Sequence, residues 1–288
     1  MFIRPLLRRL PPNLKAWIWQ VLDLIGPWPH RITAGPARGL LLVAPRQRSF
    51  AYCGGDYEPH VVATLSRFVQ PGMVACDVGS HLGYLALVLA RLAGPSGRVY
   101  AFEPLPRHVK LLRRTLARNR LAQVTVVAQA VGVHTGRATL EEWPNDAMNR
   151  VVEGIADWKG KTVQVPITTL DDWTARVEGL HRLDLIKLDI EGQELAALQG
   201  AAGLLRRYRP AIVCEIHRRD DVPYRPEEIV SWLQAAQYDV TLISTPARPN
   251  ETLASALERL RAAALPPGWM AVAHVLATPL GDTLRSIL

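Results

Sequence analysis

Beyond its first quarter, the sequence alternates short apolar runs with amphipathic stretches. The runs MVACDVG (73–79), GRVYAFE (97–103) and VTVVAQA (124–130) have the length and the β-branched content of strands. Apolar residues at helical spacing follow the first two runs, over 81–93 and from Pro104 onward. This order predicts a doubly wound α/β sheet, in which helices join mostly parallel strands.

The second half of the chain adds the strand-like runs LDLIKLDI (183–190), RPAIVCEIH (209–217), YDVTLIS (238–244) and WMAVAHVLA (269–277). A helix is predicted over roughly 193–207. Residues 132–162 are Gly-rich and polar, and only their flanks resemble strands. The expected organisation is one α/β domain over 61–288, preceded by an N-terminal arm and a lead-in segment over 1–60.

Charged residues gather at the carboxyl ends of the predicted strands. The face that carries Leu185, Lys187 and Asp189 starts apolar and ends charged, although burying an unpaired charge is costly. The strand that ends in Glu215 and His217 repeats this pattern. The first two strands also end in acids, Asp77 and Glu103. Because ligands bind at the carboxyl edge of open α/β sheets, these residues predict a ligand site there.

The loop after the first strand, DVGSHLG, narrows the choice of cofactor. Gly79 and Gly83 allow close backbone approach, and Glu103 follows Gly83 by 20 residues, where an acid can hold two ribose hydroxyls. The loop lacks the G-x-G-x-x-G order that a nicotinamide pyrophosphate requires. S-adenosylmethionine has a ribose and cationic ammonium and sulfonium groups but no phosphate. The ring of acids therefore predicts S-adenosylmethionine as the cofactor.

These segments resemble the FkbM family of S-adenosylmethionine-dependent methyltransferases. The similarity covers roughly residues 54–220, including GGDYEPHVV, the glycine loop and LDLIKLDIEGQE, and Lys-x-Asp-x-Glu-Gly is its most specific part. The resemblance implies a class I methyltransferase fold, a Rossmann-like sheet of about seven strands with one late antiparallel strand. It also implies methyl transfer, usually to a hydroxyl of a sugar or secondary metabolite. The chain departs from the family at Ser80-His81, where Ala-Asn is more common.

The residues expected to hold the cofactor come from the strand ends and the glycine loop. They are Asp77, Gly79, Ser80 and Gly83 at the methionine end, Glu103 at the ribose, Gln129 and Ala130 near the adenine, and Asp189 beside the transferring methyl group. For Gln129 and Ala130, plain termination of the strand is an alternative interpretation.

Methyl transfer to an alcohol requires alignment of the acceptor and gains from a nearby base. Asp189 and His217 are the candidate bases because both emerge at the same edge. Lys187 and Glu215 complete the catalytic candidates. Lys187 could equally form a purely structural ion pair with Asp189 or Glu215. Asp189, Glu215 and His217 also offer oxygen and nitrogen ligands for a divalent metal. No ligand pair at helical spacing supports one, so no metal is predicted.

The charge of the chain is concentrated in its N-terminal arm. The chain carries +8 overall, yet residues 1–48 hold eight Lys or Arg residues against Asp23 alone, a net +7. A basic arm on a neutral body differs from a uniformly basic protein. The three cysteines are too few for a disulfide framework, and Cys76 and Cys214 are expected to be buried free thiols of a protein in a reducing compartment.

The arm also contains a helical apolar stripe, within NLKAWIWQVLDLIGP, that is too short and too polar to span a bilayer. One interpretation is a helix that packs on the body. The other is a peripheral membrane contact through residues 1–28, with Trp17, Trp19 and Trp28 beside basic residues. The expected location is cytoplasmic, with the second interpretation placing the protein at the inner membrane surface.

The acceptor is the least determined part of this interpretation. Trp143, Asn145 and Trp158, within 141–162, suit a sugar, but a loop anchored by tryptophans explains them equally well. A small molecule, a sugar or a lipid-linked glycan is expected.

Two other classes of protein compete with this one. An RNA or other nucleic-acid methyltransferase would use the basic arm. It is disfavoured because the strand tip reads Asp-Ile-Glu-Gly, not the Asn/Asp-Pro-Pro-aromatic run of enzymes that methylate base amines. A non-catalytic S-adenosylmethionine-binding or membrane-adaptor module would leave the charges of Lys187, Asp189, Glu215 and His217 without a task.

Overall fold

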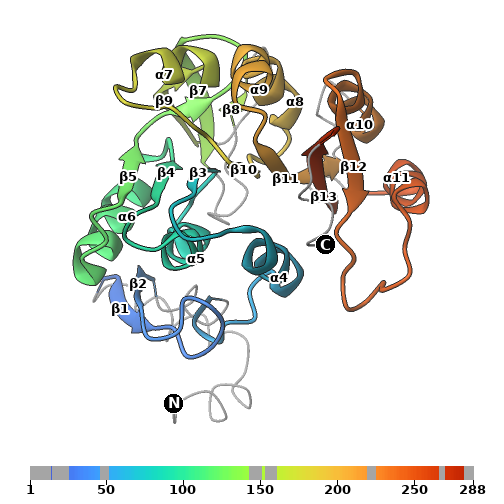
Figure 1. Cartoon of the computed structure of the whole chain (residues 1–288). Helices are drawn as coiled ribbons and strands as arrows, with labels where there is room; N and C mark the ends of the chain where they lie inside the picture. The colour runs from blue at the N-terminus through green and yellow to red at the C-terminus, as the bar shows by residue number, and fades with distance from the viewer. Residues whose placement is uncertain are drawn as a thin grey trace.

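A computed structural model of the chain describes residues 14, 26–45, 52–142, 151, 152, 161–218, 225–265 and 270–281. A seven-stranded sheet forms its centre, in the order β12-β13-β11-β10-β3-β4-β5 (Figure 1). The strands are β3 (Val74–Val78), β4 (Arg98–Phe102), β5 (Val124–Val127), β10 (Leu185–Leu188), β11 (Ala211–Arg218), β12 (Tyr238–Leu242) and β13 (Ala271–Pro279). Only β13 runs antiparallel to its neighbours, β11 and β12. The predicted doubly wound sheet with one late antiparallel strand is confirmed.

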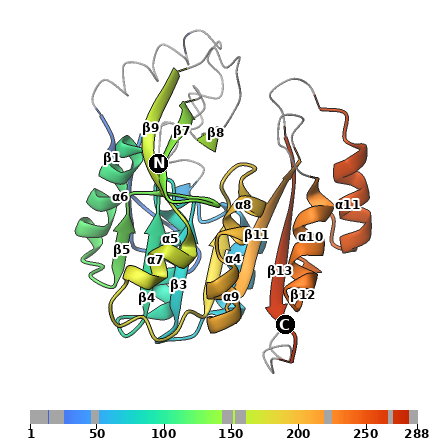
Figure 2. The same cartoon turned by 90° about the horizontal axis from the view of Figure 1, so that it is seen from above.

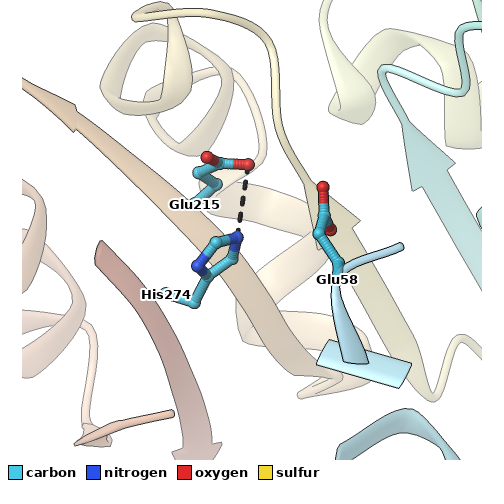
Figure 3. A group of neighbouring side chains, drawn as sticks. All are labelled: Glu58, Glu215 and His274. Atoms are coloured by element: carbon cyan, nitrogen blue, oxygen red, sulfur yellow. Dashed lines mark ion pairs between the residues drawn. The ribbon is translucent and has the colours of Figure 1, made fainter. Parts of the chain in front are cut away.

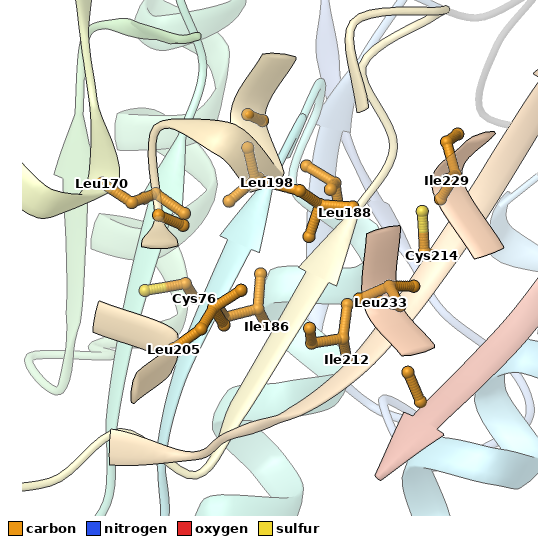
Figure 4. Close-up of a cluster of buried hydrophobic side chains, with 14 of the residues drawn as sticks. Cys76, Leu170, Ile186, Leu188, Leu198, Leu205, Ile212, Cys214, Ile229 and Leu233 are labelled. Carbon is orange, nitrogen blue, oxygen red and sulfur yellow. The ribbon is translucent and has the colours of Figure 1, made fainter. Parts of the chain in front are cut away.

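Helices cover both faces of this sheet. Successive strand residues point to opposite faces, so Ile186 and Leu188 pack in one core while Leu185 packs in the other. Figure 4 shows part of the first core, where Ile186 and Leu188 lie among helical leucines. One face holds α4 (Pro59–Phe68), α5 (Tyr84–Ala93) and α6 (Pro106–Asn119); the other holds α7 (Leu170–Arg176), α8 (Glu194–Gln199), α9 (Ala202–Tyr208), α10 (Pro226–Ala235) and α11 (Leu253–Ala262).

The helix predicted over 193–207 is wrong in one respect, because the structure divides it into α8 and α9. Gly200 lies at the break, where a Cβ atom would come within 2.1 Å of the carbonyl oxygen of Gly132. The carboxylate of Asp171 then accepts the backbone N–H groups of Gly203 (2.8 Å) and Leu204 (2.6 Å) at the start of α9. Close packing and a new N-terminal cap therefore replace a continuous helix.

A second sheet, which the sequence did not predict, lies beyond the carboxyl ends of the parallel strands (Figure 2). Its order is β6-β9-β7-β8, with β6 (Ala130–Val131), β7 (Gly136–Glu142), β8 (Val151–Val152) and β9 (Lys161–Thr168). The two strand-like flanks of residues 132–162 form β7 and β9, which pair antiparallel to each other. The acceptor candidates Trp143, Asn145 and Trp158 lie outside the described residues.

The lead-in segment is fastened to the main domain. The hairpin of β1 (Trp28–Arg31) and β2 (Leu41–Ala44) contacts α6, where Asn119 Oδ1 accepts the N–H of Leu41 (2.8 Å) and Thr115 Oγ1 accepts that of Val43 (2.9 Å). The predicted helix of the arm lies outside the described residues, apart from residue 14. Within the described part of the chain, no helix combines the length and apolarity needed to cross a bilayer. The prediction of buried free thiols at Cys76 and Cys214 is confirmed.

Candidate active site

The carboxyl edge of the parallel strands opens into a cavity of about 360 Å³. The loop after β3, the ends of β4, β10 and β11, and the segment before α4 all contribute to its wall. Of the residues predicted from the sequence, Asp77 and Gly83 are not part of this wall. The others line it: Gly79, Ser80, Glu103, Gln129, Ala130, Lys187, Asp189, Glu215 and His217.

The two glycines of the loop have different structural tasks. Gly79 has a φ of +87°, and a Cβ atom there would lie 1.8 Å from the carbonyl oxygen of Asp189. The glycine loop thus packs directly on the tip of β10, which only glycine allows. A Cβ atom on Gly83 (φ +93°) would instead lie 2.4 Å from Leu112 of α6. Gly83 therefore makes room for the side chain of Leu112, and it is not part of the cavity wall.

Glu103 is the acid that sequence analysis assigned to the ribose, and it is fixed by backbone donors. Its carboxylate accepts the N–H groups of His81 and Leu105, each at 2.9 Å, and lies 3.3 Å from Nδ1 of His108. A carboxylate offers about four lone-pair positions, so beside these three contacts one stays open for a hydroxyl of a ribose. The wall continues through Gln129 and Ala130 to the apolar side chains Leu140 and Val151, a surface suited to a flat base.

Lys187 is buried between two strand ends. Its Nζ lies 3.1 Å from Oδ2 of Asp189 and 3.7 Å from Oδ1 of Asp77. Burial alone would lower the pKa of this ammonium, but the carboxylates of Asp189 and Asp77 outweigh burial and raise it above its ordinary value. For Asp77, burial dominates and raises the pKa of the carboxyl. Lys187 is therefore a fixed cation that pairs mainly with Asp189, and it is no proton acceptor.

Asp189 sits at the tip of β10, where its carboxylate faces the cavity and its side chain is 17% exposed. Burial would raise its pKa, but Lys187 and then His217 outweigh burial and lower it. The carboxylate is therefore ionised at neutral pH. Nζ of Lys187 orients this carboxylate by donating to its Oδ2 (3.1 Å), and the backbone N–H of Asp189 holds the strand tip to the carbonyl of Val78 (3.1 Å).

His217 is enclosed by acids. Its Nδ1 lies 3.0 Å from Oε1 of Glu194, and its Nε2 lies 3.6–3.9 Å from carboxylate oxygens of Asp189, Glu191 and Glu215. Burial opposes the charged ring, but Glu194 and the other acids raise the pKa of His217 well above its ordinary value. The ring is a cation in this setting, which favours Asp189 over His217 as a proton acceptor.

Sequence analysis missed several residues of the site. Glu194 is fully buried and accepts the N–H groups of Ile190 (3.0 Å) and Gly192 (3.1 Å), but in the sequence it resembles any acid in a first helical turn. Glu58 follows a tyrosine in the segment that resembles the FkbM family, which was a usable signal. His274 is a single polar position in an apolar strand and gave none. Tyr52, Tyr57 and Tyr84 also line the cavity, with ring centroids 4.5–5.8 Å apart.

The cavity fits S-adenosylmethionine in its charge and in its donor set. Glu103 retains an acceptor for a ribose hydroxyl, the wall near Gln129 is apolar, and ionised Asp189 suits the cationic ammonium or sulfonium group. The backbone of the glycine loop runs beside these groups without a side chain at Gly79.

Comparisons with known proteins find similarity to methyltransferases. Residues 77–240, more than half of the chain, match the Methyltransferase FkbM domain. The 31-O-demethyl-FK506 methyltransferase FkbM of Streptomyces tacrolimicus is 24% identical over 206 residues, which cover 62% of this chain and 77% of that protein. A protein-L-isoaspartate O-methyltransferase of Methanothrix thermoacetophila is 41% identical over 71 residues, 24% of this chain, so the chain spans only 34% of that relative's length. The solved structure of methyltransferase FkbM from Methylobacillus flagellatus KT aligns with a TM-score of 0.44 at 16% identity, over 92% of this chain and 60% of that chain.

A seven-stranded sheet of this order, with a glycine loop after β3 and an acid at the end of β4, defines a class I S-adenosylmethionine-dependent methyltransferase domain. Within that class, the chain belongs to the FkbM methyltransferase family. Its cofactor is S-adenosylmethionine, as the sequence predicted.

Proposed function

We propose that the protein transfers a methyl group from S-adenosylmethionine to a hydroxyl oxygen of a small-molecule, sugar or lipid-linked acceptor. The observation that carries this proposal is the ionised carboxylate of Asp189, held at a strand tip by buried Lys187 and facing the cavity. A hydroxyl group is a poor nucleophile, and a carboxylate acceptor beside its proton assists its attack by about 10²–10⁴-fold.

The proposed mechanism assigns a distinct task to each charged residue. When bound, S-adenosylmethionine supplies an electrophilic methyl group. Asp189 accepts a hydrogen bond from the acceptor hydroxyl, aligns its oxygen for in-line attack and takes up its proton. Lys187 keeps Asp189 ionised and oriented. His217, as a cation pinned by Glu194, holds the surrounding carboxylates in place. The base is thereby assigned to Asp189, one of the two sequence candidates.

Two observations favour oxygen as the methylated atom. The FkbM relative is named for methylation of an oxygen, O-31 of its substrate. In addition, the tip of β10 continues as Ile190 and Glu191, without the Pro-Pro-aromatic run of enzymes that methylate base amines. When the acceptor is lipid-linked, the basic arm of residues 1–28 would bring the enzyme to an anionic membrane surface.

The proposal is tested by incubating the full chain with methyl-labelled S-adenosylmethionine and three acceptor pools: free sugars and hydroxylated small molecules, lipid-linked glycans, and RNA. Asp189→Asn serves as the blank, because it keeps the shape of the side chain but loses the charge. Label is expected in the first or second pool with the wild-type enzyme and not with the variant. Label that enters RNA alone would overturn the proposal in favour of a nucleic-acid methyltransferase.

A further inference from the structure

Three side chains beside the cavity have no task in cofactor binding or in the proposed proton transfer. Glu58, Glu215 and His274 come from the start of α4, from β11 and from β13, and their ligand atoms lie within 4.8 Å of one another. Figure 3 shows these side chains converging from three separate segments. We propose that they bind one divalent cation, which in turn binds the methyl acceptor.

The sheet itself fixes two of the three ligands. Glu215 and His274 are direct partners in the antiparallel pair of β11 and β13, so their side chains lie on the same face. Oε2 of Glu215 lies 3.3 Å from Nε2 of His274. Two ligands at about 2.1 Å from one metal ion lie roughly 3.0–3.4 Å apart at octahedral or tetrahedral angles. The two side chains form an ion pair in the structure (Figure 3), and the same spacing suits two ligands of one shared ion.

Glu58 is brought to the pair by an unusual backbone conformation. It is the residue before Pro59 at the start of α4, and its φ of 44° lies in the left-handed region. Its Oε2 is buried and has no hydrogen-bond partner among the described residues. A buried carboxylate oxygen without a hydrogen-bond partner is unfavourable, and a cation bound between Glu58 and Glu215 would offset this cost. The ligand atom of Glu58 lies within 4.8 Å of those of Glu215 and His274, whereas opposite ligands of one ion are roughly 4.2 Å apart. A small rotation of the Glu58 side chain would bring the three atoms to a common ion.

A fourth residue, His60, orients the imidazole ligand. Nδ1 of His274 lies 3.1 Å from Nε2 of His60. When His274 donates its Nδ1–H to His60, the lone pair on its Nε2 points toward Glu215 and is available to a metal ion. Metal-binding histidines almost always donate their second N–H to a neighbouring acceptor in this way.

The donor set indicates both the ion and its task. Two carboxylates and one imidazole suit Mn²⁺ or Zn²⁺, and three protein ligands leave coordination positions open, as in catalytic metal sites. The other oxygen of Glu215, Oε1, lies 3.8 Å from Nε2 of His217, so the ion would sit next to the acids around Asp189. There it would bind the acceptor oxygen and stabilise it as an alkoxide while Asp189 takes up the hydroxyl proton. This task rests on the proposed O-methyl transfer, and it favours acceptors with two neighbouring oxygens, such as a vicinal diol.

The test uses the full chain, stripped with a chelator and titrated with Mn²⁺, whose binding is followed by electron paramagnetic resonance. One tightly bound Mn²⁺ per chain is expected. Glu58→Gln and His274→Gln should each weaken it by at least about 100-fold, the upper end of what the loss of an outer-shell partner costs. Glu258→Gln, an exposed acid on α11, is the control and should bind like the wild type.

The proposed site would be overturned if the wild type bound no Mn²⁺, or if Glu58→Gln bound Mn²⁺ as tightly as the wild type. Glu58→Gln decides alone if His274→Gln fails to fold, because its side chain is not part of the sheet. Binding of S-adenosylhomocysteine, measured on the stripped protein, separates this proposal from the proposed function. Full methyl transfer by the stripped enzyme would refute the proposed role of the cation and leave the proposed methyl transfer intact. If the metal-loaded enzyme binds Mn²⁺ but methylates none of the acceptors, the cation site stands and the proposed O-methyl transfer is refuted.

Discussion

Replacement of Glu103 by glutamine should separate its two tasks, holding the ribose and anchoring the glycine loop. Glu103 is 5% exposed, accepts two backbone N–H groups at 2.9 Å, lies 3.3 Å from Nδ1 of His108 and keeps a lone pair for a ribose hydroxyl. In Glu103→Gln an amide nitrogen replaces one acceptor oxygen, so one ribose hydrogen bond and one loop hydrogen bond are lost. A hydrogen bond to a charged group contributes roughly 1.5–3 kcal/mol, which corresponds to about 10–150-fold in affinity.

Isothermal titration with S-adenosylhomocysteine measures this loss without turnover, and urea denaturation measures stability separately. Asp171→Asn is the matched control, because Asp171 also accepts two backbone N–H groups but lies outside the cavity wall. Both variants should lose about 1–3 kcal/mol of unfolding free energy, since each leaves a buried N–H unpaired. Only Glu103→Gln should bind the ligand more weakly. Wild-type affinity in Glu103→Gln, or an equal loss in Asp171→Asn, would refute the assignment to the ribose.

Three further changes test other parts of the site. Asp189→Asn should lower kcat by about 10²–10⁴-fold while the affinity for S-adenosylhomocysteine stays within a few-fold; unchanged kcat at saturating acceptor would reduce Asp189 to a structural role. Gly83→Ala should lower the unfolding free energy by about 1–3 kcal/mol, because its Cβ atom enters occupied space at a positive φ; an unchanged urea midpoint would show that α6 yields instead. Deletion of residues 1–27, which leaves β1 complete, should abolish co-sedimentation with anionic vesicles without lowering the melting temperature, if the arm is a membrane contact. A destabilised truncation, with no vesicle binding by the full chain, would show that the arm packs on the body.

The main sheet could be predicted because its signals are local. Each parallel strand is a short apolar run, and the charges at its end mark the same edge of the sheet whatever the rest of the chain does. Lys187, Asp189 and Glu103 could therefore be placed at one site from the sequence alone.

The parts that could not be predicted depend on contacts between distant segments. The second sheet rests on pairing of β7 with β9 across a polar stretch, and the division of α8 from α9 depends on the approach of Gly200 to Gly132. Glu58 and His274 meet only through the start of α4 and the register of β11 with β13. The Tyr-Glu pair of the FkbM-like segment marks Glu58 in the sequence, but nothing there marks His274 or brings the two together.

The central claim is that Asp189 directs the methyl group to an oxygen atom. The most direct measurement uses S-adenosylmethionine carrying a ¹³C-methyl group, incubated with the full chain and an extract that contains candidate acceptors. The carbon chemical shift of each new methyl signal distinguishes O-methyl from N-methyl and C-methyl products. New O-methyl signals are expected with the wild type and should be absent with Asp189→Asn. New signals confined to nitrogen or carbon, or O-methyl signals of equal intensity with Asp189→Asn, would contradict the claim.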